Sequence, residues 1–487
     1  MFLTLRHLLS IMPIVLLSLA ACAVNPATGE RSFTGFMSEA QEIEVGQETH
    51  PKILAEFGGA YDNAALQRYV ESIGELLAST TERPDIDFTF TVIDSPMINA
   101  FALPGGYVYV TRGLLALADN EAEVASVVGH EIGHVIARHS AQRYSRSVLA
   151  QIGAIGLGIA TGSGELANLA GSGAAVYLQS FSRDQEFEAD TLGIRYMARA
   201  NFDPQAAADF LAKLQAHSQL EATLAGQPES TDKSNIMATH PRTVDRVQRA
   251  IENAGATQVT DPILARDIYL DQIDGMLYGE DPSQGVVRGR RFLHPDLRFA
   301  FEVPEGFTLR NNPNQVIAQG PGDTLIVFDL APKPGSDSML TYLTREWAGN
   351  MNFADAERIE IDGMEAATGS TRLRTQQGPR DVRLVAIRYD ADTVYRFMFL
   401  TPPDLTEEQS LGLRETTYSF RRLSEAEAAA IEPLRVKIIT VRPGDTVESL
   451  AEQMPFGDYR EERFRVLNDL PEDAGLIPGQ RVKIISG

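Results

Sequence analysis

Residues 128–134 read Val-Gly-His-Glu-Ile-Gly-His, the pattern His-Glu-x-x-His inside an apolar, helical stretch. Four residues advance a helix by about 400°, so His130 and His134 lie within about 40° of one face. Two neutral imidazoles there can take two corners of a zinc tetrahedron. Glu131 lies about 100° round from His130, beside the metal, where a general base is needed. The stretch predicts a metal-binding helix; the alternative is a helix whose histidines are satisfied in a core.

A catalytic zinc needs a third protein ligand and leaves its fourth position to water. Residues 184–190 read Asp-Gln-Glu-Phe-Glu-Ala-Asp, in which Glu186 and Asp190 share a helix face and Glu188 faces away from it. In the gluzincin arrangement a Glu binds zinc, and an Asp one turn later accepts a hydrogen bond from a ligand histidine. We predict Glu186 as the third ligand and Asp190 as the partner of His130; a solvated acidic helix face is the alternative.

Two further histidines lie near this pattern in the sequence. His139 follows His134 by five residues, about 140° away on a continuous helix, so we expect it to be structural rather than a ligand. His240 stands in Thr-His-Pro, with Arg246 downstream. Its ring could hydrogen-bond the oxyanion of peptide hydrolysis, occupy the open position of zinc, or cap the helix that follows. The residues alone leave these three roles open.

The His-Glu-x-x-His pattern with Glu186 and Asp190 resembles the BepA/HtpX-like zinc metallopeptidases, the family that includes the CAAX prenyl proteases. Residues 99–115, Asn-Ala-Phe-Ala-Leu-Pro-Gly-Gly-Tyr-Val-Tyr-Val-Thr-Arg-Gly-Leu-Leu, are similar to the strand and turn before the family's metal helix. His240 and Arg246 match its late His-Pro motif. The resemblance covers about residues 35–255.

That resemblance implies hydrolysis of peptide bonds with one zinc per chain and with Glu131 as the base. It implies a substrate-binding edge strand near Asn99, Ala100 and Phe101, and a late histidine that gates the metal. In lipid-anchored and periplasmic relatives it implies quality control of outer-membrane proteins. Those relatives often carry tetratricopeptide repeats, and none is recognisable in this sequence, so that mode of partner binding is not carried over.

The N-terminal residues have the features of an export signal. Arg6 precedes an apolar run, Leu8 to Ala20, that is short for a membrane span, and Leu-Ala-Ala precedes Cys22. Small residues before a cysteine resemble a lipobox, so we expect lipidation of Cys22 after removal of residues 1–21. The residue after Cys22 is Ala23 and not an Asp. By resemblance to Gram-negative lipoproteins, this favours the outer over the inner membrane. The prediction is a lipid-anchored protein on the periplasmic side of the cell envelope.

The last fifty residues resemble a LysM module. Residues 439–451 contain Pro-Gly-Asp-Thr, residues 464–468 read Phe-Arg-Val-Leu-Asn, and residues 476–485 contain Ile-Pro-Gly-Gln. The pattern predicts strand, helix, helix, strand. Such modules often hold N-acetylglucosamine polymers, so residues 437–487 could bind peptidoglycan; a degenerate copy used for packing is the alternative.

The fold class predicted for the 487 residues is multidomain, because the chain is too long for one core. We expect a mainly α-helical, gluzincin-like peptidase domain with a small β-sheet, then an α+β domain, then a βααβ LysM-like domain. The predicted parts are a signal peptide (1–21), a tether (22–40), the peptidase (41–274), a linker (275–290), the α+β domain of unknown role (291–423), a helical connector (424–436) and the LysM-like domain (437–487).

Local patterns within these parts predict particular elements. Helices are expected at 113–126, 127–146, 182–200 and 338–347, and strands at 299–303, 324–330, 382–389 and 394–400. The glycine-interrupted apolar stretch 148–178 is expected to form a packed helical hairpin, with a transmembrane segment as the alternative.

Composition excludes one class of partner. The net charge is -23, whereas binding to nucleic acid needs a basic surface. The expected partners are protein or peptide substrates, the membrane through Cys22 and peptidoglycan. The expected function is a zinc endopeptidase acting on misfolded or stalled outer-membrane proteins. The alternative is a latent or non-proteolytic scaffold, or a chaperone-like lipoprotein.

Overall fold

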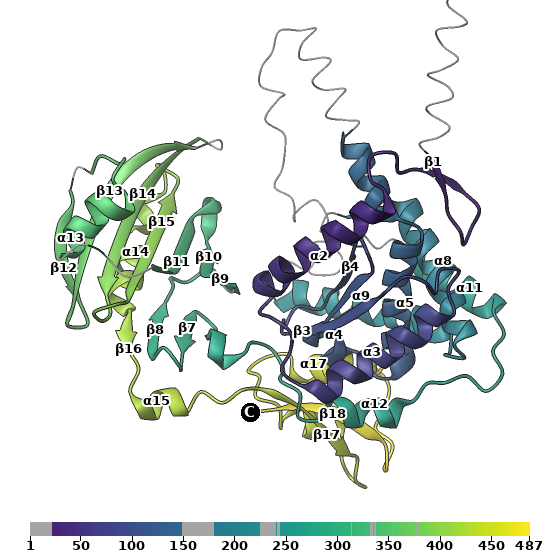
Figure 1. The fold of residues 1–487 in the computed structure, drawn as a ribbon. Helices are drawn as coiled ribbons and strands as arrows, with labels where there is room; N and C mark the ends of the chain where they lie inside the picture. The colour runs from purple at the N-terminus through teal and green to yellow at the C-terminus, as the bar shows by residue number, and fades with distance from the viewer. Residues whose placement is uncertain are drawn as a thin grey trace, which may run out of the picture. The chain divides into compact units, whose positions relative to one another are not determined.

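The computed structural model describes residues 22–148, 180–224, 240, 244–312, 314–331, 335, 338–353, 355–375 and 378–487 (Figure 1). The chain forms two compact units: the residues up to Gly279 together with Arg435–Gly487, and the residues Glu280–Leu434. An isolated antiparallel bridge between Leu277 and Arg435 marks where the chain leaves the first unit and returns to it. The second unit is therefore inserted into the first.

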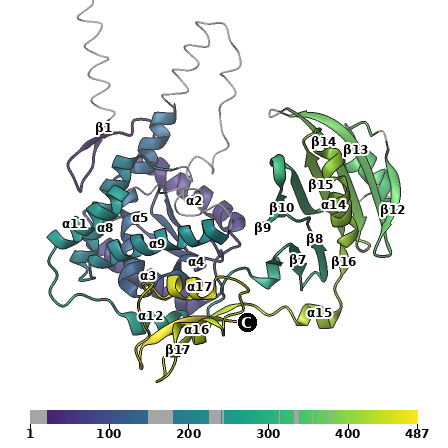
Figure 2. The same ribbon diagram turned by 180° about the vertical axis from the view of Figure 1, so that it is seen from behind.

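The first unit is mainly helical (Figures 1 and 2). Its helices, in chain order, are α2 (Glu39–Glu56), α3 (Ala64–Ser79), α4 (Arg112–Leu117), α5 (Glu121–Ile136), a helical stretch at 139–148, α8 (Arg183–Arg199), α9 (Gln205–Leu224), α11 (Val244–Ala256) and α12 (Arg266–Ile273). Helix α5 is buried along most of its length and packs against α3, α8 and α9. It forms the centre of this unit.

Glycines let α5 and α8 approach closely. A Cβ on Gly193 of α8 would lie 2.9 Å from the backbone nitrogen of His130, and one on Gly133 of α5 would lie 3.0 Å from the carbonyl oxygen of Ala189. Such contacts leave no room for a side chain, so the two backbones pack directly against each other. This packing brings the polar face of α8 to the two histidines of α5.

A small three-stranded sheet lies beside α5. Its strands are β3 (Thr89–Ile93), β4 (Ala100–Leu103) and β5 (Tyr107–Thr111), in the order β3-β5-β4. Strand β3 is parallel and β4 antiparallel to β5. The predicted turn is present: Gly105 and Gly106 both have positive φ, at 81° and 94°. Strand β4 is an edge strand among the described strands.

A short hairpin and the C-terminal segment complete the first unit. Strand β1 (Cys22–Val24) pairs with β2 (Arg31–Phe33) in antiparallel register. The C-terminal segment forms β17 (Arg435–Thr440), α16 (Val447–Ala451), α17 (Arg460–Leu467) and β18 (Arg481–Ser486), with β17 and β18 paired. Its order of strand, helix, helix, strand confirms the pattern predicted for the LysM-like residues.

The C-terminal segment packs against the first unit through a buried lysine. The Nζ atom of Lys483 donates to the carbonyl oxygens of Ala116, Leu117 and Ala118 at 3.0, 2.8 and 2.7 Å. It also lies 3.0 Å from Oδ1 of Asp119. These residues join the end of α4 to the start of α5, so the last strand of the fold is bonded to the start of α5.

The second unit is built on two antiparallel sheets. The larger has the order β12-β13-β14-β15-β11-β10-β9 and the smaller the order β16-β8-β7-β6. The strands are β6 (Val286–Arg288), β7 (Arg291–His294), β8 (Phe299–Glu302), β9 (Thr308–Asn312), β10 (Gln315–Gln319), β11 (Leu325–Ala331), β12 (Glu357–Ile361), β13 (Met364–Thr375), β14 (Gly378–Arg388), β15 (Val394–Thr401) and β16 (Arg421–Arg422). The helical elements are η3 (Pro282–Gln284), η4 (Pro321–Asp323), α13 (Met339–Thr341), η5 (Tyr342–Trp347), α14 (Thr406–Ser419) and α15 (Glu425–Ala429). Aromatic side chains including Phe299, Phe328 and Phe397 fill its core.

Several predicted elements are confirmed and two are wrong. The strands predicted at 299–303, 324–330, 382–389 and 394–400 are present, and Ser182 caps α8 as part of a capping box. The helix predicted over 113–126 breaks after Leu117. The helix predicted over 127–146 breaks at Ala137 and Arg138, because Arg138 has a left-handed φ of 57°.

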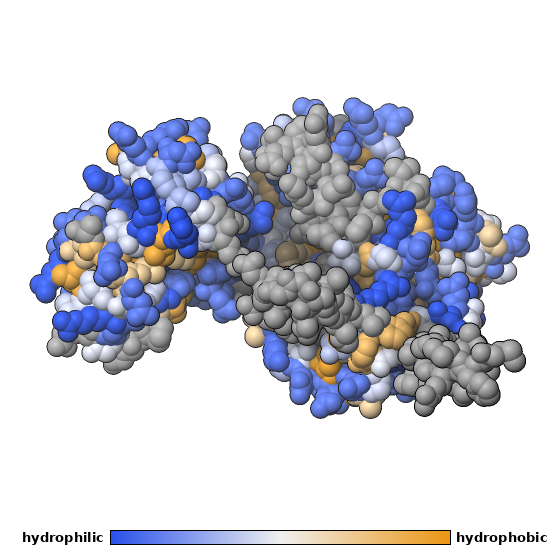
Figure 3. All heavy atoms as spheres, turned by 90° about the horizontal axis from the view of Figure 1, so that it is seen from above, coloured by the Kyte–Doolittle hydropathy of each residue, from blue (hydrophilic) through white to orange (hydrophobic). Residues whose placement is uncertain are grey.

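Two predictions about membrane segments fall largely outside the described residues. The signal peptide at 1–21 lies outside them, as does nearly all of the apolar stretch 148–178. In the part of the chain that the structure describes, no helix has the length and apolar character needed to cross a bilayer. Hydrophilic side chains cover most of the coloured surface in the view of Figure 3.

Candidate metal centre

Four buried side chains from three parts of the first unit converge on one point. His130 and His134 come from α5, Glu186 from α8, and His240 from the segment that precedes α11. One potential ligand atom from each lies within 4.8 Å of those of the others. The three ligands predicted from sequence are thus brought together, and His240 joins them.

The distances show how tightly the cluster is gathered. Nε2 of His130 lies 3.0 Å from Nε2 of His134. Glu186 directs Oε2 at His130 and Oε1 at His134, each at 3.5 Å. Nδ1 of His240 lies 3.0 Å from Oε1 of Glu186. Two imidazoles and a carboxylate are the donor set of a catalytic zinc site, and His240 adds a third imidazole.

A buried ion-pair network holds the carboxylates of α8. Oδ1 of Asp190 lies 2.9 Å from Nδ1 of His130, which is the contact predicted from sequence. Arg246 donates to both oxygens of Asp190, at 2.8 and 2.7 Å. A third nitrogen of Arg246 lies 2.7 Å from Oε2 of Glu186. The guanidinium fixes both acids, a task for which its planar fork is suited.

The protonation of these groups suits a metal. Burial raises the pKa of Glu186, but the charge of His240 and hydrogen bonds with the neighbouring histidines outweigh it and hold this pKa well below its ordinary value. Burial lowers the pKa of His134 well below its ordinary value. An ionised carboxylate and a neutral imidazole are the forms that bind a divalent cation. His130 differs: burial lowers its pKa, but Asp190 and Glu186 outweigh this effect and raise it to about 10, so metal binding there must displace a proton.

Glu131 is placed beside the cluster rather than in it. Its side chain is 1% exposed, and neither carboxylate oxygen accepts a hydrogen bond from another described residue. Nε2 of His240 is 3.4 Å from its Oε1. Burial raises the pKa of Glu131 above the ordinary value of a glutamate. A buried carboxylate without a donor and with a raised pKa is suited to accept a proton from a reacting group.

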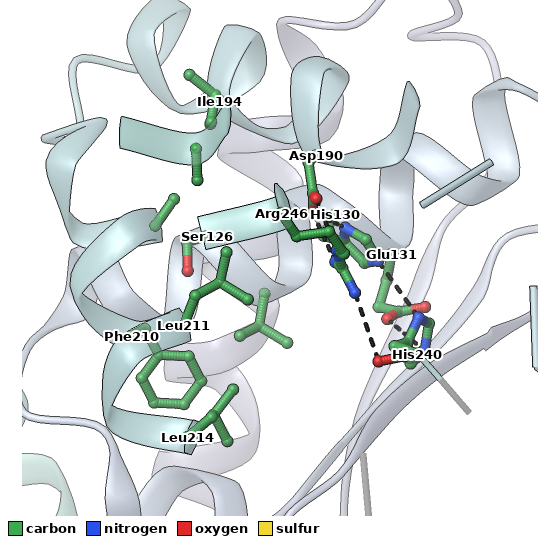
Figure 4. A pocket seen from close by; sticks show the side chains of 13 residues that line it. Ser126, His130, Glu131, Asp190, Ile194, Phe210, Leu211, Leu214, His240 and Arg246 are labelled. Atoms are coloured by element: carbon green, nitrogen blue, oxygen red, sulfur yellow. Dashed lines mark hydrogen bonds and ion pairs between the residues drawn. The ribbon is translucent and has the colours of Figure 1, made fainter. Parts of the chain in front are cut away.

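A pocket with two unlike halves borders the cluster. Figure 4 shows His130, Glu131, Asp190, Arg246 and His240 gathered on one side. The other side is contributed by α5, α8, α9 and α11 and is apolar apart from Ser126. Its members are Val127, Ile194, Ala207, Phe210, Leu211, Leu214 and Ala250. The space between the atoms is about 570 Å³, part of it open to solvent.

The remaining predicted site residues lie elsewhere in the first unit. Ala100 and Phe101 belong to the edge strand β4 and Asn99 precedes it; all three side chains are buried. Cys22 begins strand β1. Sequence reasoning missed two other residues: His139 contacts His134, and Glu188 contacts His139. The contact of His139 with His134 is possible because the helix breaks at Arg138. No residue pattern in the sequence predicts this break.

Comparison with known families agrees with this geometry. Residues 64–254 match the family described as Peptidase family M48, and residues 439–484 match the LysM domain. The first match spans β3 to β5 and all of α5 and α8. The second spans the strand-helix-helix-strand segment.

Curated relatives are similar over the peptidase part. The "Beta-barrel assembly-enhancing protease" of Escherichia coli (strain K12) is 31% identical over 243 residues, 48% of this chain and 48% of that protein. The protein of the same name from Yersinia pestis is 32% identical over 253 residues, 50% of each. The "Mitochondrial metalloendopeptidase OMA1" of Schizosaccharomyces pombe is 31% identical over 228 residues, 45% of this chain and 62% of that protein. The chain thus spans about half the length of the bacterial relatives.

Proposed function

We propose that this chain, whose residues 64–254 match Peptidase family M48, is a zinc-dependent endopeptidase of the bacterial cell envelope. The observation that carries the proposal is the convergence of His130, His134 and Glu186 with an unbonded Glu131 beside them. His130, His134 and Glu186 would hold the ion. A zinc ion held there supplies a Lewis acid that acidifies a water molecule and polarises a carbonyl.

The protein's own groups then have separate tasks. Glu131 accepts a proton from the attacking water at a carboxylate oxygen and returns it to the nitrogen of the leaving amine. Asp190, whose Oδ1 lies 2.9 Å from Nδ1 of His130, fixes which nitrogen of that ring faces the cluster. Arg246 holds Asp190 and Glu186 in place. The apolar half of the pocket takes an apolar substrate side chain next to the cleaved bond.

We propose that His240 closes the site. Its Nδ1 lies 3.0 Å from Oε1 of Glu186 and its Nε2 lies 3.4 Å from Oε1 of Glu131, so one ring contacts both a ligand and the base. With His240 as a fourth donor beside His130, His134 and Glu186, a bound zinc would have no place for water, which is the pattern of a structural rather than a catalytic site. His240 must therefore move before hydrolysis. This arrangement is also what favours the second candidate function, a latent scaffold whose site stays closed.

The envelope setting is part of the same proposal. Cys22, after removal of residues 1–21, would carry the lipid anchor on the periplasmic side, in the outer rather than the inner membrane. Residues 439–484, as a LysM domain, would bind peptidoglycan. The substrates would be misfolded or stalled outer-membrane proteins, by similarity to relatives named for β-barrel assembly.

The substitution Glu131→Gln tests the proposal. The variant should retain about one zinc per chain, because Glu131 is not a ligand, and it should lose casein cleavage by about 100-fold or more. Zinc content measured by atomic absorption and cleavage measured with and without a chelator give the two readouts. Undiminished cleavage by Glu131→Gln would refute the assignment. Zinc bound by the wild type without any cleavage would favour the latent scaffold.

A further inference from the structure

The ring of His139 lies against His134 because the helix breaks between them. Helix α5 ends at Ile136, Arg138 adopts a left-handed φ of 57°, and a new helical stretch starts at His139. The helical stretch that starts at His139 therefore does not continue the path of α5. Nδ1 of His139 comes within 2.7 Å of Nδ1 of His134, and the side chain of His139 is fully buried.

The two contacts of His139 determine where the protons sit. Nε2 of His134 faces the metal cluster, so a neutral ring must carry its proton on Nδ1. That N–H donates to Nδ1 of His139. The proton of His139 must then be on Nε2, which lies 3.1 Å from Oε2 of Glu188 and donates to it. With both rings neutral, only this arrangement satisfies both contacts.

His130 and His134 are thus supported in parallel ways. Nδ1 of His130 meets Asp190 directly at 2.9 Å. Nδ1 of His134 reaches the carboxylate of Glu188 through the ring of His139. A carboxylate behind a metal-binding histidine fixes the tautomer and orientation of the ring and raises its basicity. One ligand has a short connection of this kind, and the other has a longer one.

The N-terminal hairpin holds the far end of the longer connection. Asn25 and Thr28, in the turn between β1 and β2, donate to Oε1 of Glu188 at 2.5 and 3.2 Å. Arg195 of α8 donates to the carbonyl oxygen of Ala27 in the same turn at 3.0 Å. Glu188 therefore accepts one hydrogen bond on Oε2, from His139, and two on Oε1, from the hairpin.

We propose that His139 and Glu188 are positioning residues for the metal ligand His134, and that residues 22–33 act on the metal through Glu188. The inference rests on the zinc site of the proposed function. It predicts that the segment directly after Cys22 adds to zinc affinity although it contains no ligand. Removing any link should loosen the ring of His134 and weaken zinc binding.

Zinc affinity of the full chain, measured by competition with a chromogenic chelator, tests the relay. His139→Phe keeps a ring but offers His134 no acceptor, and should weaken zinc about 10- to 100-fold. Glu188→Ala should weaken it about 10-fold. Glu188→Gln should weaken it less than Glu188→Ala does, because its amide oxygen still accepts from Nε2–H of His139 while its NH2 group faces the donors Asn25 and Thr28. Glu82→Gln is the matched control, since Glu82 also bonds two side chains of α8, Tyr196 and Arg199, but lies outside the relay.

Cobalt provides a second readout, which reports the geometry of the ligands in variants that remain folded. The visible absorption bands of the cobalt-substituted protein report ligand geometry, so they should shift in Glu188→Ala, shift less in Glu188→Gln and remain in place in Glu82→Gln. Thr28→Val, which acts from the hairpin, should give a smaller change in the same direction as Glu188→Ala.

The outcomes separate this inference from the proposed function. A wild type that binds no zinc would overturn the metal site itself. The relay alone would be overturned by a different result. In that case the wild type binds zinc, and both Glu188→Ala and a folded His139→Phe match its zinc affinity and its cobalt spectrum. If His139→Phe does not fold, the difference in zinc affinity between Glu188→Ala and Glu188→Gln decides whether the relay exists.

Discussion

Nζ of Lys483, in the last strand of the fold, lies 3.0 Å from Oδ1 of Asp119, the residue before the N-cap of α5. Both side chains are buried, and Lys213 also pairs with the same carboxylate. The helix that carries His130 and His134 therefore starts at a charge cluster that the C-terminal segment completes.

Replacing Lys483 with methionine should destabilise the first unit by about 3 kcal/mol. Three backbone carbonyls lose their donor and a buried carboxylate loses one of its cations. Urea unfolding followed by circular dichroism measures the change. Lys437→Met, at an exposed position on the paired strand β17, is the control and should change stability by less than about 0.5 kcal/mol. Equal stability of the two variants would contradict the importance of this contact.

Removing the C-terminal segment and removing the second unit should have opposite effects. A chain ending at Leu434 loses β17, β18 and the Lys483 contacts, and should neither fold stably nor bind zinc. A chain in which a short Gly-Ser linker joins Gly279 to Arg435 should fold and bind zinc, because the Leu277–Arg435 bridge keeps these ends close. Thermal unfolding and zinc content check both variants. A stable, zinc-binding truncation would show that the last strand is dispensable.

His240→Ala should increase casein cleavage several-fold. The substitution removes the ring that contacts both Glu186 and Glu131, and so opens the position that water needs. Initial rates at equal zinc occupancy provide the measurement. A fall of about 100-fold with zinc retained would instead assign His240 to stabilisation of the oxyanion.

Ala207→Phe should change which peptides are cleaved. Ala207 lines the apolar half of the pocket, where an added ring would fill space beside Phe210 and Leu211. We expect kcat/KM to fall about 10-fold or more for peptides with a bulky apolar residue next to the cleaved bond, and far less for those with alanine there. Equal losses for both peptides would place the substrate side chain outside this pocket. Ile251→Phe, on an exposed position of α11, is the control.

Glu123 should make stability depend on pH. Burial raises the pKa of Glu123 to about 7, although the charge of Lys213 opposes the shift. The folded state then binds a proton that the unfolded state releases above about pH 4.5, so this contribution to stability is present at low pH and is lost as pH rises through about 7. The melting temperature of Glu123→Gln relative to wild type should therefore rise between pH 5 and pH 8. A constant difference would contradict the shift.

The positions of the cluster residues could be predicted from the sequence where they depend only on the spacing of residues along a helix. His130 and His134, like Glu186 and Asp190, are four residues apart, and each pair shares a face whatever surrounds it. The sequence also predicts that α8 lies against α5, because His130 and His134 need a third ligand and Glu186 on α8 can provide it.

The contacts of His139 could not be predicted, because they depend on a break in the helix. The angle predicted from His134 to His139 assumes a continuous helix, and the left-handed φ of Arg138 breaks that helix. Glu188 does face away from Glu186, as predicted, but it meets His139 there rather than solvent. The burial of Lys483 was also invisible, because it depends on a packing partner far away in the sequence.

The insertion of residues 280–434 has a consequence for biosynthesis. Translation delivers α5 and α8 early, but the strand that carries Lys483 emerges only after the whole inserted unit has been made. A nascent chain thus holds every metal ligand while the core around Asp119 is still open. We therefore expect the cluster of His130, His134 and Glu186 to reach its final geometry only after the last strand docks, late in the synthesis of the chain.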